Sequence, residues 1–191
     1  MPSHQALEAA HLIDRLERLA RAGEQVEGLN PAQWEALRYL ARANRFSRTP
    51  AALADYLAST RGTVSQTLIA LEAKGFVTRE PSERDRRSID LQLTRQGRRT
   101  LDNDPLTALA SHIERAAGAR IEDLVESLRG ALANTIAHNK GKAFGACYTC
   151  RHFRRNARAS AKAPHHCGLL DEPLSDADSR DICLEQEPVP A

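Results

Sequence analysis

Apolar residues recur at every third or fourth position through most of the first 140 residues, which is the pattern of amphipathic helices. The first stripe lies in residues 3–22, and a later one begins at Ile121 and ends at Ile136. Asn30-Pro31 and Thr49-Pro50 each predict a helix start, because Asn and Thr are good N-caps and Pro fits the first helical turn. The pattern therefore predicts a mainly α chain with long helices at both ends of this region.

Residues 57–97 combine a helix with two alternating runs. The predicted helix is capped by Ser59 or Thr60 and ends at Lys74-Gly75, where a glycine after a lysine is a stop signal. Residues 76–79 and 88–94 then alternate like strands around a polar turn at 81–87. Two short helices followed by a basic β-hairpin predict a winged helix-turn-helix.

Side chains suited to DNA gather at two places in this stretch. The start of the predicted recognition helix offers hydroxyls, an amide and an arginine that can reach base edges or phosphates. The hairpin tip offers arginines that fit a narrow minor groove. The predicted DNA-binding residues are Thr60, Arg61, Thr63, Ser65, Gln66, Arg84, Arg86 and Arg87. By itself, an arginine-rich turn such as residues 84–87 is commonly just a solvated charged surface. Its position after a helix-turn-helix favours a wing.

Composition limits where nucleic-acid binding can come from. The formal net charge is only +2, so DNA binding must rest on where the arginines lie. No run of about 18 apolar residues predicts a membrane span, and the N-terminus does not resemble a signal peptide. We therefore expect a cytoplasmic protein, in which the four cysteines are free for metal or redox chemistry instead of structural disulfides.

The cysteines lie in the last quarter of the chain. Cys147 and Cys150 form a CxxC pair, and Cys167 and Cys183 follow after sixteen and fifteen residues. Four thiolates predict one metal centre per chain, either Zn²⁺ or an iron–sulfur cluster. Free thiols or a reversible Cys147–Cys150 disulfide are the alternatives.

The three histidines of this region are predicted to have a surface or supporting role, since four sulfurs already complete a site. They are His152, His165 and His166. Residues 141–146, GKAFGA, predict a flexible hinge. The predicted organisation is thus a winged-helix and dimerisation domain at 1–140 and a cysteine-rich metal-binding module at 141–191.

Residues 7–136 resemble the MarR family of transcription regulators. The most specific likeness is ERDRRSIDLQLTRQG, which resembles the family's wing, and STRGTVSQTLIALEAKGFV is similar to its recognition helix. The resemblance implies a homodimer joined through its first and last long helices and bound to a pseudo-palindromic site on double-stranded DNA. It also implies a small-molecule effector, whose site the sequence does not place, and it says nothing about the cysteine tail.

The leading hypothesis is therefore a sequence-specific DNA-binding regulator, not an enzyme, whose output is tuned by a metal or redox centre. The alternative is a thiol-redox or metal-dependent enzyme that uses the CxxC pair. No thioredoxin-like βαβ pattern surrounds Cys147 and no HExxH motif is present, which disfavours that alternative. A protein-interaction adaptor that has lost DNA binding is disfavoured by the arginines of the hairpin.

Overall fold

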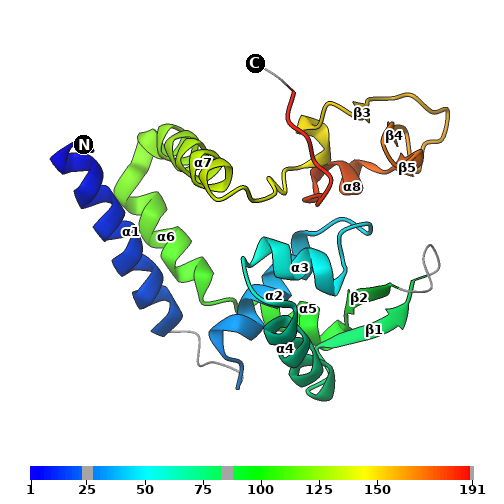
Figure 1. The fold of residues 1–191 in the computed structure, drawn as a ribbon, viewed down its shortest axis with the longest axis horizontal. Helices are drawn as coiled ribbons and strands as arrows, with labels where there is room; N and C mark the ends of the chain where they lie inside the picture. Colours follow the sequence, from blue (N-terminus) through cyan, green and yellow to red (C-terminus); the bar gives the residue numbers. More distant parts are fainter. Residues whose placement is uncertain (23–27, 83–87, 190–191) are drawn as a thin grey trace.

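The computed structural model describes residues 1–22, 28–82 and 88–189, and Figure 1 shows how its parts are arranged. The first part holds the helices α1 (His4–Ala22), α2 (Pro31–Arg42), α3 (Pro50–Tyr56) and α4 (Arg61–Ala73), and then the strands β1 (Val77–Pro81) and β2 (Ile89–Leu93). Then come α5 (Arg95–Leu101), α6 (Leu106–Ala117), a 3₁₀ turn η1 (Gly118–Arg120) and α7 (Ile121–His138). The last part holds η2 (Cys147–Thr149), β3 (Phe153–Arg154), β4 (His165–Cys167), β5 (Glu172–Leu174) and α8 (Asp176–Arg180).

Helices α2, α3 and α4 pack with β1 and β2 around a hydrophobic core. Trp34, Leu37, Leu53 and Leu68 are all fully buried there. The two strands are antiparallel, with Val77 opposite Leu93, and they form the predicted hairpin. The predicted winged helix-turn-helix is thus present in the fold.

Side-chain caps fix where these helices begin. Asn30 and Gln33 form a reciprocal capping box at α2, and the Thr49 and Thr94 side chains cap α3 and α5. At α4 the cap is Thr60, which resolves the choice between Ser59 and Thr60. Each cap satisfies a backbone N–H that the helix itself cannot pair.

Gly97 allows α5 to lie against the turn that follows α4. A Cβ atom at this position would lie 2.2 Å from the carbonyl oxygen of Phe76. The Thr94 amide donates to the same carbonyl at 3.0 Å. Only glycine permits this backbone approach, which sets the position of α5 beside the wing.

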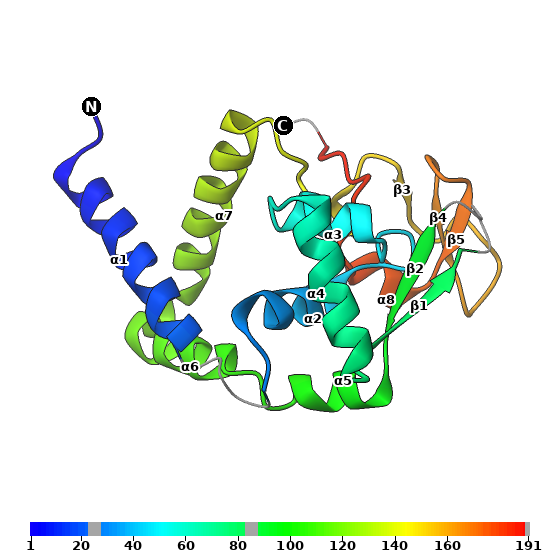
Figure 2. The same ribbon diagram turned by 60° about the horizontal axis from the view of Figure 1, so that its bottom comes forward.

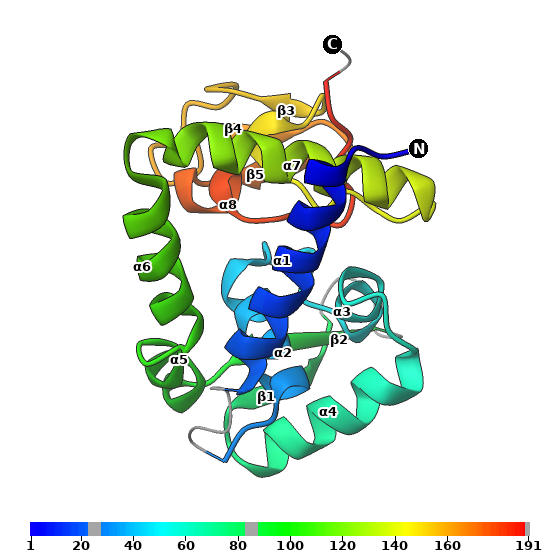
Figure 3. The same ribbon diagram turned by 90° about the vertical axis from the view of Figure 1, so that its left-hand side faces the viewer.

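Helices α1, α6 and α7 form an arm beside the winged helix (Figures 2 and 3). None of the three buries a residue within this chain. Residues 102–105 separate α5 from α6, and the turn that begins at Gly118 separates α6 from α7. None of the described helices is both long and apolar enough to span a bilayer.

The last 44 described residues, 146–189, are called the cysteine segment here, and they pack on the winged helix. A three-stranded sheet of order β3-β4-β5 forms its centre. Ile182 from this segment and Phe144 just before it belong to the winged-helix core. Phe144 packs against Tyr39 and Tyr56, with ring centroids 6.1 and 5.2 Å away, so the prediction of a flexible hinge at 141–146 is wrong at this residue. An aromatic side chain at that point buries more apolar surface than a linker would.

Candidate nucleic-acid interface and thiolate site

The first turns of α4 present a polar, accessible face. Arg61, Thr63 and Gln66 are exposed and Ser65 is half-buried, whereas Val64, Leu68 and Leu71 on the other side are buried. Exposed Thr60 accepts a hydrogen bond from the Thr63 amide at 3.1 Å. The helix therefore holds its predicted DNA-facing side chains on one surface and is anchored by the opposite one.

Hydrogen bonds join the two strands of the wing at their outer end and join β2 to the loop before α3. The Ser82 amide donates to the carbonyl of Ser88 at 3.0 Å and closes the hairpin. The Leu91 amide donates to the carbonyl of Arg48 at 2.7 Å. The predicted tip residues Arg84, Arg86 and Arg87 lie outside the described residues, so their contacts stay a prediction.

The basic residues of α5 are further candidates for DNA binding that the sequence analysis did not include. Arg95, Arg98 and Arg99 are exposed on this helix. A polar cleft there is lined by Arg95, Gln96, Arg99, Thr100 and Asn103. Their spacing of three and four positions was the available signal, because it places basic side chains together on a helix surface.

All four cysteines line one cavity of the cysteine segment. Cys147 and Cys150 come from the turn of η2, Cys167 ends β4, and Cys183 follows α8. The remaining wall is largely apolar and includes Phe153, Leu169 and Leu174. The fold thus brings together the four sulfurs that are scattered in the sequence.

N–H groups of the described residues point at these sulfurs. The Asn44 side-chain amide donates to Cys147 Sγ at 3.4 Å, and the backbone amide of Glu187 donates to Cys150 Sγ at 3.5 Å. A hydrogen bond from Cys147 lowers the pKa of Cys183 to about 6. The same hydrogen bond, together with burial, raises the pKa of Cys147. The Cys147–Cys183 pair therefore favours one thiolate, which is the form that binds metal.

The convergence of possible metal ligands can be checked against the needs of each centre. Within residues 1–22, 28–82 and 88–189, no three Cys, His, Asp or Glu side chains converge tightly enough to hold a single ion. A structural zinc site requires four ligands at about 2.3 Å from one centre. An iron–sulfur cluster is held by sulfurs that stand further apart, because each binds a different iron atom.

The histidines of the segment face carboxylates. The nearest oxygen lies 3.3 Å from His152 Nε2 (Glu187), 3.0 Å from His165 Nε2 (Asp176) and 3.2 Å from His166 Nε2 (Asp171). His165 is buried, its ring lies 5.0 Å from that of Phe153, and its Nδ1 accepts from the Asn156 amide. His152 also lines the cysteine cavity, so the supporting role of the histidines stays a prediction.

Comparison with known proteins supports the winged helix. Residues 27–88 match the model of the MarR family. No curated protein matches the chain. Among solved structures, a MarR transcriptional regulator from Methanosarcina mazei Go1 is 25% identical, with a TM-score of 0.56 over 68% of this chain and 96% of the other.

Two further structures share the fold. The regulator BldR from Sulfolobus solfataricus is 21% identical, with a TM-score of 0.56 over 70% of this chain and 99% of its own. The S. aureus MepR–DNA complex is 20% identical, with a TM-score of 0.54 over 72% of this chain and 99% of its own. The structure around α2–α4 and the β1–β2 strands is a winged helix, and this part of the chain is similar to the MarR family.

Proposed function

We propose that the protein is a sequence-specific transcription regulator that binds a pseudo-palindromic operator as a homodimer. The observation that carries this proposal is the exposed polar start of α4 beside the β1–β2 hairpin. Arg61 and Gln66 have the side chains that pair with guanine and adenine edges in the major groove. MepR, which shares the fold, has been solved in complex with DNA.

The arm supports the homodimer. Large apolar side chains are exposed along it, and contiguous surfaces of this kind mark interfaces. They are Leu7, Leu12, Ile13, Leu16 and Leu19 on α1, Leu106 on α6, and Leu124, Val125, Leu128 and Leu132 on α7. A second copy of the chain would cover them, and two-fold symmetry would place two α4 helices on the half-sites of a palindrome.

Selection of duplexes from a random pool, followed by titration at several salt concentrations, tests DNA binding. We expect Arg61→Ala and Gln66→Ala to weaken binding about tenfold each and to relax specificity at one base position. Arg86→Ala and Arg87→Ala in the hairpin are expected to weaken binding sharply. Arg158→Ala, an exposed arginine of the cysteine segment, is the control. Equal affinity in all these variants, or no selected sequence at all, contradicts the proposal.

We further propose that the four cysteines hold a tetrathiolate metal centre, which is the sensing part of the regulator. Of the two centres we prefer an iron–sulfur cluster, because the wall of the cavity is largely apolar and N–H groups donate to two of its sulfurs. The apolar wall of Phe153, Leu169 and Leu174 would keep water from such a cluster. The two N–H donors to sulfur are of the kind that tune its potential.

Purification without oxygen, with an absorption spectrum and iron, sulfide and zinc analysis, tests the centre. We expect a brown protein with iron and sulfide. Cys150→Ser should lose the metal, whereas His166→Gln, which changes a residue facing Asp171, should keep it. A colourless protein with one zinc per chain excludes the cluster, and a protein free of metal excludes the centre.

A further inference from the structure

The loop between α2 and α3, residues 43–49, lies between the wing and the cysteine segment. Ala43, Asn44 and Ser47 are almost completely buried in it, with exposed fractions of 0, 0 and 1%. A polar loop is buried to this extent only where its backbone and side chains find partners. The partners of this loop come from both neighbours.

Toward the cysteine segment, the loop is bonded next to two of the four cysteines. Asn44 donates its side-chain amide to Cys147 Sγ at 3.4 Å, and its backbone amide donates to the carbonyl of Ile182 at 2.9 Å. Ile182 immediately precedes Cys183. The Leu184 amide, on the other side of Cys183, donates to Ser47 Oγ at 2.8 Å. The positions of Cys147 and Cys183 therefore fix the position of the loop.

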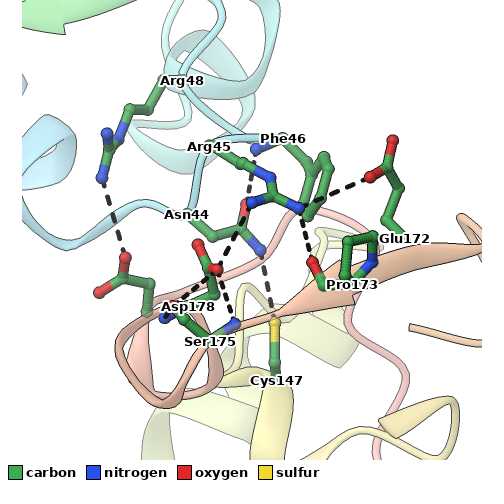
Figure 4. Close-up of polar contacts among 10 residues, drawn as sticks. Asn44, Arg45, Phe46, Arg48, Cys147, Glu172, Pro173, Ser175 and Asp178 are labelled. Atoms are coloured by element: carbon green, nitrogen blue, oxygen red, sulfur yellow. Dashed lines mark hydrogen bonds and ion pairs between the residues drawn. The ribbon is translucent and has the colours of Figure 1, made fainter. Parts of the chain in front are cut away.

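A second set of contacts surrounds Arg45, as Figure 4 shows. Its guanidinium donates to the carbonyl of Pro173 at 2.6 Å. It also lies 3.5 Å from a carboxylate oxygen of Glu172 and 3.6 Å from one of Asp178. These contacts hold β5 and α8, the elements between Cys167 and Cys183, against the same loop.

Toward the DNA-binding part, the loop supports both the wing and the helix-turn-helix. The carbonyl of Arg48 accepts from the Leu91 amide of β2 at 2.7 Å. Thr49 caps α3 through the Ala52 amide, at 3.2 Å. Tyr39 of α2 donates its hydroxyl to the carbonyl of Ser47 at 2.6 Å. A shift of this loop would therefore move the base of the wing and the start of α3 together.

We infer that this loop couples the thiolate centre to DNA binding: the occupied centre holds residues 43–49 in the DNA-competent arrangement, and Asn44 is the positioning residue that links the two. This inference rests on the proposed function. The buried apolar core of the cysteine segment consists of Leu174 and the cysteines 147 and 183 themselves. Because this core is so small, the part of the segment around the cysteines depends on its metal for order. Ile182 stays anchored in the winged-helix core, while loss of the metal loosens Cys147 and the chain at Cys183 beside the loop.

Asn44 has two separate roles that a single substitution distinguishes. Its Oδ1 accepts from the Phe46 amide at 3.1 Å, which shapes the loop, while its Nδ2 donates to sulfur. Asn44→Asp keeps the acceptor and replaces the N–H donor with an oxygen that repels a thiolate. Asn156→Asp makes the same chemical change at an exposed position of the cysteine segment and is the matched control.

Hydrogen exchange and DNA titration of the intact chain, with its metal and after removal of the metal by a chelator, test the inference. The probe is the duplex selected with the metal-bound protein. We expect loss of the metal to speed exchange at residues 43–49 and at the Leu91 amide, and to weaken DNA binding about tenfold, a typical coupling between sites. Asn44→Asp should reproduce both effects with its metal bound, whereas Asn156→Asp should reproduce neither.

The outcomes separate this inference from the function itself. If the selected duplex binds equally well with and without metal and exchange at 43–49 is unchanged, the coupling is wrong while the DNA-binding function stands. If no duplex is selected, the function fails first. Should Asn44→Asp not fold, Arg45→Gln cuts the loop's contacts with Glu172, Pro173 and Asp178 from an exposed position, and it is expected to speed exchange in the same residues.

Discussion

Arg38 of α2 donates two hydrogen bonds to the carboxylate of Asp104, just before the first helix of the arm after the wing. Arg38 Nε donates to Oδ2 at 2.8 Å and Nη2 donates to Oδ1 at 2.5 Å. Both side chains are largely buried, with 17 and 12% of their surface exposed. Asp104 lies two residues before Leu106, the first residue of α6. Its contact with Arg38 therefore sets where α6 leaves the winged helix.

We predict that Asp104→Asn destabilises the protein by about 1–2 kcal/mol at pH 7, since a hydrogen-bonded charge pair loses its charge. Burial by itself would raise the pKa of Asp104, but the Arg38 hydrogen bonds and the Leu106 amide lower it below its ordinary value. A lowered pKa means that the stabilisation is complete above the unfolded value near 4 and is lost as the pH falls through the folded pKa. Thermal unfolding at pH 7 and pH 3 checks this: the difference between wild type and variant should shrink at pH 3, and an equal difference at both would contradict it.

The α4 cap gives a second prediction. Thr60→Ala should cost about 1 kcal/mol of stability, because the Thr63 amide loses its acceptor. Ser59→Ala, one residue earlier, is the matched control and should cost much less. Denaturant unfolding of the two variants measures the difference, and similar losses in both would argue against Thr60 as the cap.

Gly97 gives a third. Gly97→Ala places a methyl group 2.2 Å from the backbone oxygen of Phe76, which cannot move without displacing α5. We expect a loss of about 3 kcal/mol, at the upper end for overpacking. Gly130→Ala in α7 meets no atom within 4 Å and should instead stabilise its helix slightly. Calorimetry of both variants tests the contrast, and a stable Gly97→Ala protein would show that α5 sits elsewhere.

Ile182→Ala should destabilise the winged helix itself, by about 2–5 kcal/mol, although the residue lies in the cysteine segment. Trp34, the single tryptophan, is fully buried in that core and reports on its unfolding by fluorescence. Val189→Ala changes an exposed side chain near the same end of the chain and is the control. An unchanged tryptophan transition in Ile182→Ala would mean that Ile182 is not part of the core.

The arm gives the fifth prediction. Leu132→Glu introduces a charge on α7, at a side chain with 60% of its surface exposed in the single chain. If this face joins two copies, the charge must be buried unpaired, and the dimer should dissociate. Sedimentation velocity measures the change, with Val189→Glu, which places the same charge at an exposed side chain outside the arm, as the variant that keeps the wild-type mass.

Helix boundaries followed from local chemistry and were predictable from the sequence. The caps at Asn30, Thr49 and Thr94 and the break at Gly118 all act on neighbouring backbone groups, so the sequence contains their whole cause. The alternating pattern of residues 88–94 likewise predicted β2.

Contacts between distant parts of the chain could not be predicted in this way. Phe144 was predicted to be part of a hinge because its partners, Tyr39 and Tyr56, lie 105 and 88 residues earlier in the chain. Asn44 gave no signal at all, since an asparagine in a polar loop is ordinary until Cys147 is placed beside it. The cysteines were predictable as a set because thiolates at such spacings have few other uses, but the surface on which they rest was not.

The anchoring of Ile182 in the winged-helix core has a practical consequence for protein engineering. A chimera that grafts residues 146–189 onto another winged helix would leave Ile182 without its pocket. It would also lack Arg45, which contacts Glu172, Pro173 and Asp178 in this protein. The transplantable unit is therefore discontinuous and must include residues 42–48 of the donor. A biosensor built from this chain should exchange the DNA-facing side chains of α4 and keep the rest intact.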